Sequence, residues 1–272
     1  MITIVTDSTS YFKKQEAEKA GILVIPNNYT INGQSFSETY SDQNEDFERL
    51  LMNSAANSTS HINIADCWDC FEEERRKGNQ VLCITISSRF SGSYNTACIA
   101  AGQIEGNDVT VFDSKLTAGG LYLLVNEAKI MVDKGMSVQE IVKELSVIRE
   151  RISIVFSVDD MTPLRNSGRL GFVRSSIGTF LNIKPILQCK DGALVSDCTV
   201  RGDREVIKHL SEKISPKTKK AVISYIGSNH LASDLYHVIK SNAPDTELSL
   251  QKVGPVLGIH LGFKMIAVSF MD

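Results

Sequence analysis

Clusters of hydroxyl side chains follow the apolar runs of this 272-residue chain at the points where those runs end. Asp7-Ser-Thr-Ser10 follows one run, Ser88-Arg-Phe-Ser-Gly-Ser93 another and Asp113-Ser-Lys115 a third, while Thr59 and Ser60 stand just before a helical stretch. Hydroxyls and backbone N–H groups at helix N-termini bind anions. Helix capping explains any single loop of this kind. For several loops together, a shared anion site is an equally good interpretation.

Ser91 lies where a strand would turn into a helix, as the nucleophile of many serine hydrolases does. That turn requires the pattern G-x-S-x-G, and Arg89 and Ser93 occupy the two glycine positions. A hydroxyl that only donates a hydrogen bond to an anion needs no such turn. The chain also contains neither G-x-x-x-x-G-K-S/T nor G-x-G-x-x-G, so a nucleotide-binding loop is not indicated.

Two arginines and one histidine lie in segments with unusual composition. Arg169 stands between Gly168 and Gly171, and Arg201 follows a predicted hairpin. Either guanidinium could pair with a carboxylate or a phosphate, although a helix end with a surface arginine explains Arg169 equally well. His260 lies in an apolar segment with three glycines. Such a histidine is usually a core residue, whereas the glycines suggest that the backbone approaches something closely.

The six cysteines are scattered and do not frame a small disulfide-linked domain. Cys67 and Cys70 have the spacing of a redox pair but fall inside a predicted helix, whereas a redox cysteine lies at an exposed helix N-terminus. We therefore favour structural thiols over a redox pair. No second cysteine pair completes a zinc site and no cluster of His, Asp and Glu has metal-ligand spacing, so we expect no metal.

The first half of the chain alternates short apolar runs with helical patterns. Helices of ten or more residues between strands predict a parallel sheet with right-handed crossovers. The dipeptide Asn32-Gly33 predicts a hairpin turn. The predicted strands are 2–5, 22–25, 81–86 and 108–112, and the predicted helices are 11–20, 44–53, 65–77, 91–103, 117–134 and 137–151.

The second half has a different pattern, with a hairpin at Asp191-Gly192 and fewer helices. Its predicted strands are 152–158, 184–189, 193–200, 221–226, 248–253 and 265–270, and its predicted helices are 205–214 and 230–240. This pattern predicts an α+β half with a mainly antiparallel sheet. We place the boundary near residue 150, which predicts an α/β domain over 1–150 and an α+β domain over 151–272.

Composition excludes several classes of protein. Apolar residues make up 42% and charged residues 22%, ordinary values that argue against a disordered or fibrous chain. The net charge of −3 gives no support for nucleic-acid binding, which requires a basic surface. No apolar stretch approaches the roughly 20 residues that cross a bilayer, and the first residues lack the pattern of a signal peptide. We expect a soluble cytoplasmic protein.

These motifs, taken in order, resemble the DegV family of bacterial fatty-acid-binding proteins. The resemblance runs over the whole chain, and no single motif would carry it alone. The segments that match are 5–10, 59–60, 86–94, 111–115, 166–170, 183–186, Arg201 and 254–260. The chain departs from the family pattern at His61-Ile62, at Phe90 and Ser93, and in the run 261–265.

The resemblance implies a two-domain protein that binds one long-chain fatty acid, such as palmitate, stearate or oleate. The acyl chain would lie in an apolar tunnel, with the carboxylate at the domain interface. The first domain would have the α/β fold shared with dihydroxyacetone kinases. By this resemblance, the residues that bind the carboxylate are Thr59, Ser60, Ser91, Gly92 and His260.

The resemblance also implies a partner, the catalytic subunit of a fatty acid kinase, which phosphorylates the bound carboxyl group to an acyl phosphate. Arg169 and Arg201 match basic positions around the site or toward that partner. The chain itself would supply no catalytic residue and need no cofactor. It would be a monomer that could contact the membrane surface transiently.

Two alternatives remain open at this point. One is a stand-alone hydrolase or phosphatase that uses Ser91 and His260, although the sequence identifies no acidic residue to orient the histidine. The other is a lipid sensor or carrier that works without a kinase.

Overall fold

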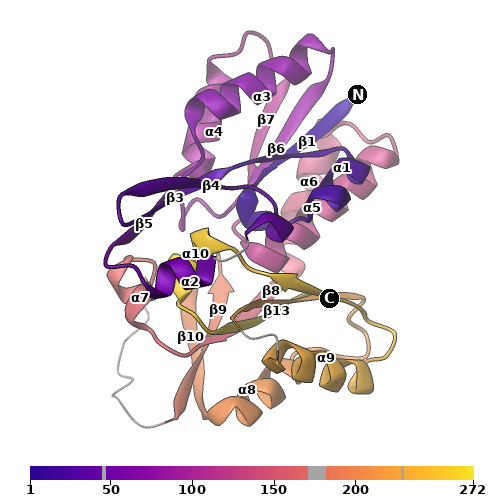
Figure 1. Cartoon of the computed structure of the whole chain (residues 1–272). Coiled ribbons are helices and arrows are strands. Elements are labelled where there is room, and N and C mark those ends of the chain that lie inside the picture. The colour runs from indigo at the N-terminus through magenta and orange to yellow at the C-terminus, as the bar shows by residue number, and fades with distance from the viewer. Residues whose placement is uncertain (45–46, 171–181, 228–229) are drawn as a thin grey trace.

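Residues 1–44, 47–170, 182–227 and 230–272 are described by the computed structural model, in which helices surround three β-sheets (Figure 1). The first half of the chain builds a parallel sheet, the second half builds a larger mixed sheet, and a small third sheet lies beside them. Among the helices in these ranges, none combines the length and the hydropathy of a membrane-spanning segment.

The parallel sheet has four strands in the order β2-β1-β6-β7. Its strands are β1 (Ile2–Asp7), β2 (Ile22–Ile25), β6 (Gln80–Thr85) and β7 (Val109–Asp113). Apolar side chains alternate between its two faces, as strand geometry requires. Helices cover both faces, which makes this half a three-layer α/β/α arrangement (Figure 1). These helices are α1 (Lys14–Ala20), α3 (Ile64–Arg76), α4 (Ser93–Gly102), α5 (Ala118–Asp133) and α6 (Val138–Arg151).

The alternation along β1 and β6 assigns each helix to a face. Ile4 and Leu82 pack in one core with residues of α5 and α6. Val5 and Cys83 pack in the opposite core with residues of α3 and α4. Burial raises the pKa of the α3 thiols Cys67 and Cys70 to about 12, so both stay protonated, as expected of structural cysteines.

The mixed sheet has six strands in the order β10-β9-β8-β13-β11-β12, and every neighbouring pair is antiparallel except β11 with β12. Helices α8 (Gly202–Ser211) and α9 (His230–Asn242) pack on one face. The strands are β8 (Ile152–Val158), β9 (Ile183–Lys190), β10 (Ala193–Arg201), β11 (Lys220–Ile226), β12 (Glu247–Lys252) and β13 (Met265–Met271).

Helix α5 lies between the two large sheets, because it contacts β1 on one side and β8, β11 and β13 on the other. Two glycines make this close packing possible. A Cβ atom on Gly119 would stand 2.9 Å from Val222, and one on Gly120 would stand 2.6 Å from Ile154. The two halves of the chain therefore share one continuous core.

The small sheet is an antiparallel hairpin with a third strand, in the order β4-β3-β5. Asn32 and Gly33 both have positive φ, as the predicted hairpin turn requires. Three short helices lie together on the side of this sheet toward the mixed sheet (Figure 1). The elements of this region are β3 (Asn27–Ile31), β4 (Gln34–Glu38), β5 (Asn57–Ser60), α2 (Phe47–Met52), α7 (Thr162–Asn166) and α10 (Pro255–Leu261), with the 3-10 turns η1 (Ser8–Ser10) and η2 (Ser41–Gln43).

The predicted fold class is confirmed, with a parallel sheet in the first half and a mainly antiparallel sheet in the second. Some local predictions were wrong. The helix predicted over 11–20 begins at Lys14, because Tyr11 is buried with a φ of 53° that ends the preceding turn. The helix predicted over 44–53 spans Phe47–Met52 in the described part, and residues 45–46 lie outside it.

Candidate functional site

A cavity of about 280 Å³ lies where the three sheets meet, beyond the carboxyl ends of β1 and β6. Ligands of open α/β sheets bind at this edge. Its walls are mostly apolar and come from both halves of the chain. The apolar lining residues are Ile86, Phe90, Ala118, Ile154, Phe156, Leu164, Cys189, Leu194, Val256, Leu257, Leu261, Met265 and Ala267. The polar ones are Thr9, Asn27, Thr59, Ser60, His61, Ser91, Thr117, Arg169 and His260.

Thr59 and His260 form a hydrogen bond across 201 positions of sequence. The Thr59 hydroxyl oxygen lies 2.7 Å from Nε2 of His260. Thr59 is in β5, where it pairs with Tyr29 of β3, so the small sheet fixes its place. The other imidazole nitrogen, Nδ1, is buried and has no partner among the described residues. The pair forms a polar part of the cavity wall.

The carboxyl group of Glu38 is buried and holds the first turn of helix α10, which carries His260. Glu38, at the end of β4, accepts a hydrogen bond from the Val256 backbone N–H at 2.9 Å and another from the Ser8 hydroxyl at 2.8 Å. Burial raises the pKa of Glu38 to about 7. Position 254 requires glycine, because a Cβ atom there would stand 2.4 Å from the Glu38 carboxylate. This contact ties α10 to the small sheet.

Ser91 lies in the loop between β6 and α4. Its hydroxyl is 2.9 Å from the hydroxyl of Ser93 and accepts a hydrogen bond from the Ser93 backbone N–H at 3.3 Å. Ser93 in turn donates to the side-chain oxygen of Asn27. Gly92 allows close packing, because a Cβ there would stand 2.9 Å from the ring of His61. The loop therefore carries the Ser91 hydroxyl into the cavity wall.

A second buried carboxylate, Asp7, holds the strand ends behind this loop. It accepts hydrogen bonds from the backbone N–H of Ile86 at 2.6 Å and from the backbone and hydroxyl of Thr9. The amide of Asn27 also donates to it, at 3.3 Å. Burial raises the pKa of Asp7, and these four hydrogen bonds act against that shift. The residue thus fixes the ends of β1 and β6 beside the cavity.

Arg169 provides a positive charge at the cavity wall. It is half-buried and donates hydrogen bonds to the carbonyl oxygens of Phe90 at 3.3 Å and Ser167 at 2.5 Å. Burial and the nearby Arg169 charge lower the pKa of His260 to about 4. At neutral pH the imidazole of His260 is therefore uncharged, and among the described residues that line the cavity Arg169 supplies a permanent positive charge.

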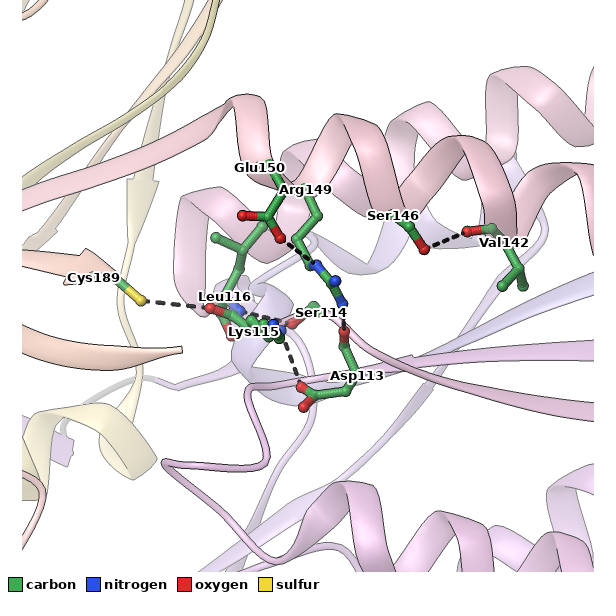
Figure 2. Close-up of polar contacts among 9 residues, drawn as sticks. All are labelled: Asp113, Ser114, Lys115, Leu116, Val142, Ser146, Arg149, Glu150 and Cys189. Atoms are coloured by element: carbon green, nitrogen blue, oxygen red, sulfur yellow. Dashed lines mark hydrogen bonds and ion pairs between the residues drawn. The ribbon is translucent and has the colours of Figure 1, made fainter. Parts of the chain in front are cut away.

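The loop that follows β7 connects this region to both α6 and the mixed sheet (Figure 2). Arg149 of α6 donates to the Asp113 carbonyl at 2.9 Å, and the thiol of Cys189 in β9 lies 3.5 Å from the Lys115 carbonyl oxygen. The Asp113 carboxylate accepts two hydrogen bonds from Ser88. Ser87 donates across to the carbonyl of Gly192 in the β9–β10 turn. The loop 87–93 is therefore anchored to both halves of the chain.

Six of the seven residues predicted for the site line this one cavity: Thr59, Ser60, Ser91, Gly92, Arg169 and His260. Arg201 does not line it. It is the last residue of β10, exposed, at the start of α8. Gly171, which the sequence places beside Arg169, lies outside the described residues.

Sequence reasoning missed Asn27 and Glu38. Asn27 links Ser93 to Asp7, and Glu38 supports the helix that carries His260. The signal available for Asn27 was its position directly after an apolar strand and Pro26. The sequence around Glu38 gives no such signal, because Val256, the residue of α10 that it contacts, is 218 positions away.

Comparison with known proteins identifies the relatives of this chain. The family model described as "Uncharacterised protein, DegV family" matches residues 1–272. The chain belongs to the DegV family. A DegV domain-containing protein of Staphylococcus aureus is 33% identical over 95% of this chain and 94% of its own length. One from Halalkalibacterium halodurans is 30% identical over 99% of this chain and 98% of its own length.

A solved structure of a DegV-family protein has the same fold as this chain. It is described as fatty acid binding of a DegV family protein from Thermus thermophilus. It is 26% identical, has a TM-score of 0.90 and covers 100% of this chain and 99% of that one. The DegV-family fold therefore holds from the first described residue to the last.

Proposed function

We propose that this DegV-family protein binds one long-chain fatty acid, with the acyl chain in the apolar part of the cavity and the carboxylate at its polar wall. The observation that carries the proposal is the cavity itself. Apolar side chains make up most of its lining, while Thr59, Ser91 and Arg169 meet at the polar wall. In this proposal residues 1–150 supply the carboxylate-binding loops, and 151–272 form the domain that closes over the lipid.

The energetics favour a ligand that is apolar along its length and charged at one end. Burying a 16-carbon chain releases on the order of 12 kcal/mol before entropy costs, at about 0.8 kcal/mol for each methylene. A buried carboxylate without partners would offset much of that gain. In the proposed pose the Ser91 hydroxyl turns its one proton from Ser93 to the carboxylate, which also accepts hydrogen bonds from the Thr59 hydroxyl and from the backbone near Ser60 and Gly92. Arg169 balances its charge.

The Thermus thermophilus relative supports the ligand class, because it is described as fatty-acid-binding and its fold covers the whole chain. Neutral His260 fits the same picture. A neutral imidazole bonded to Thr59 orients that hydroxyl without competing with Arg169 for the carboxylate.

We extend the proposal to presentation of the carboxyl group to a fatty acid kinase. A second hollow of about 410 Å³ shares Thr59, Arg169 and His260 with the cavity, so these residues separate the cavity from an outer pocket. A carboxylate held at this wall would be reachable by the partner from outside. Phosphoryl transfer needs positioning and positive charge, and Arg169 at this wall supplies charge. This chain would present the substrate and leave ATP chemistry to the partner.

The hydrolase alternative is less well supported. A serine nucleophile would be hydrogen-bonded to the histidine. Here the Ser91 hydroxyl contacts Ser93, and the hydrogen bond to His260 is made by Thr59. A hydrolytic histidine is oriented by an acid on its second nitrogen, whereas Nδ1 of His260 has no partner among the described residues.

A competition assay tests the ligand and its head group together. A fluorescent fatty acid is bound to the delipidated protein and displaced by oleate, palmitate or methyl oleate. We expect the free acids to displace the probe at concentrations at least tenfold below the ester, because the ester cannot pair with Arg169. Equal displacement by acid and ester would contradict the carboxylate site, and no displacement by any of them would contradict lipid binding.

The presentation step has its own test. The oleate-loaded chain is incubated with a fatty acid kinase catalytic subunit, ATP and hydroxylamine, which traps an acyl phosphate as a hydroxamate. We expect hydroxamate only when both proteins are present. Binding of oleate without any hydroxamate would support a carrier or sensor and contradict presentation to that kinase.

A further inference from the structure

A second cluster of reactive side chains lies on the mixed sheet, and none of its members lines the fatty-acid cavity. Asp197 and Cys198 belong to β10, and His209 belongs to α8. Nε2 of His209 is 3.0 Å from Oδ2 of Asp197 and 3.9 Å from the sulfur of Cys198. Each residue offers one ligand atom, and these atoms all lie within 4.8 Å of one another. They form a carboxylate, a thiol and an imidazole around one point.

Two consecutive residues of β10, Asp197 and Cys198, both contact helix α8. Successive side chains of a regular strand point to opposite faces, so Asp197 and Cys198 would normally face apart. The pairing of β10 with β9 shifts register between Ser196 and Cys198, which is a β-bulge. A bulge re-aims side chains and is common next to functional sites. Here it lets both residues reach His209 on α8.

The separations suit a small transition-metal ion. With Zn–S near 2.3 Å and Zn–N near 2.0–2.1 Å, ligand atoms on one tetrahedral zinc lie roughly 3.3–3.6 Å apart. The distances of 3.0 Å and 3.9 Å from Nε2 of His209 lie on either side of that range and would have to change by a few tenths of an ångström. The third separation, between the ligand atoms of Asp197 and Cys198, is within 4.8 Å, so a bound ion would have to draw these two side chains to the same range. All three residues are part-exposed, which leaves an open fourth position for water or another ligand.

Outer contacts hold the carboxylate in place. The side chain of Gln188 in β9 donates a hydrogen bond to Asp197. Carboxylates that bind metals are commonly oriented by such a neighbouring hydrogen bond. Lys213 also pairs with Oδ2 of Asp197, at 3.1 Å. This ammonium group already occupies a cation position beside the carboxylate. A bound metal would have to displace it, so Lys213 is a competitor whose removal should strengthen binding.

We propose that Asp197, Cys198 and His209 form a three-ligand site for a divalent transition metal of the zinc class, which would join β10 to α8. Sequence spacing did not reveal it, since Cys198 and His209 lie eleven positions apart on different elements. A carboxylate, thiolate and imidazole set selects zinc or cobalt over magnesium or calcium, which prefer oxygen ligands alone.

Cobalt binding to the reduced full-length chain tests this proposal. Co²⁺ bound to a thiolate produces a near-ultraviolet charge-transfer band, and Zn²⁺ should bleach it by displacement. We expect the band in the wild type, its loss in Cys198→Ser, at least tenfold weaker binding in Asp197→Asn, and severalfold tighter binding in Lys213→Met.

Cys98→Ser is the matched control, since Cys98 is a part-buried thiol outside the cluster, and it should keep the band. Circular dichroism of each variant shows whether it folds. No band in the wild type, or a band that survives Cys198→Ser, would overturn the proposal. A band that survives Lys213→Met with no gain in affinity would overturn the competitor role of the lysine.

Discussion

At the scale of single residues, Arg169 is the group that would balance the charge of a carboxylate in this mostly apolar cavity. It supplies a permanent positive charge among the described residues of the cavity wall, whereas His260 is neutral at physiological pH. Its bonds to the carbonyls of Phe90 and Ser167 use two of its five N–H donors and fix the guanidinium group in place. Its other three donors have no partner among the described residues, and in the proposed pose they face the carboxylate.

The substitution Arg169→Met should therefore weaken fatty-acid binding by roughly tenfold to hundredfold, since hydrogen bonds to charged groups contribute about 1.5–3 kcal/mol. Displacement of a fluorescent fatty acid measures the change. Affinity for a neutral analogue, oleyl alcohol, should stay the same. Arg165→Met is the control, because Arg165 is exposed and does not line the cavity. Equal losses for acid and alcohol would contradict a charge-specific role.

Ser91 should contribute through its hydroxyl alone. Ser91→Ala removes one donor to the carboxylate and should lower affinity about tenfold. Ser88→Ala, in the same loop but bonded to Asp113, should leave affinity unchanged. If both variants retain wild-type affinity, Ser91 is not part of the carboxylate site.

The residues that the sequence revealed were those with a recognisable local setting. Thr59, Ser91, Arg169 and His260 each belong to a motif, and the structure brings all four to one cavity. Glu38 could not be found in this way, because its partners Ser8 and Val256 are fixed only by the tertiary fold.

At the scale of elements, the long strands and helices were predictable and the short ones around the site were not. Strand β5 has the polar sequence Asn-Ser-Thr-Ser and becomes a strand by pairing with β3. Helix α10 has only seven residues and contains a glycine, so intrinsic helix propensity cannot define it. Its stability comes from the Glu38 contact and from packing of Gly258 against Phe47.

Gly254→Ala should disturb the start of α10. The new Cβ would stand 2.4 Å from the Glu38 carboxylate and 2.7 Å from the Asn44 amide, so the cap on α10 must shift. We expect a loss of about 1–3 kcal/mol of unfolding free energy and weaker fatty-acid binding. Chemical denaturation and the displacement assay measure the two effects.

Gly102→Ala is the control, because a Cβ there would meet no atom within 4 Å. It should not reduce either quantity. Unchanged stability and affinity in Gly254→Ala would show that the Glu38 contact does not position α10.

At the scale of the whole molecule, stability should depend on pH through Glu38. Its pKa is about 7 in the folded state and 4.5 in the unfolded chain, because burial disfavours the charged form. Its stabilising contribution is complete below pH 4.5 and is lost as pH rises through 7. The loss is on the order of 3 kcal/mol. Glu38→Gln does not titrate, and its amide cannot accept both of the hydrogen bonds that the two carboxyl oxygens accept, a loss that is the same at every pH. The stability of the variant relative to the wild type should therefore rise by about 3 kcal/mol between pH 4.5 and pH 8.

Urea unfolding of both proteins at several pH values measures this difference. His260 acts with the opposite sign, since its folded pKa of about 4 favours the neutral form, and stability is lost as pH falls from 6.5 toward 4. That contribution is present in both proteins and cancels in the comparison. A difference between them that stays constant with pH would contradict the buried-carboxylate account.

The two-sheet architecture followed from the spacing of apolar runs, but the way the halves combine did not. Helix α5 contacts strands of both sheets, and the residues that make this possible are two consecutive glycines, Gly119 and Gly120. A glycine pair at a helix start has no unique meaning in a sequence. The cavity arises from this close packing and from the loops at the carboxyl end of the parallel sheet, so its volume and shape required the structure.

Native mass spectrometry of the protein as purified, followed by denaturing lipid analysis, tests the central claim most directly. We predict one added mass per chain that corresponds to a single long-chain fatty acid, released on denaturation. Arg169→Met should carry less of it. A wild-type protein that is free of lipid, and that also takes up no added oleate or palmitate, would contradict the claim that the cavity is a fatty-acid site.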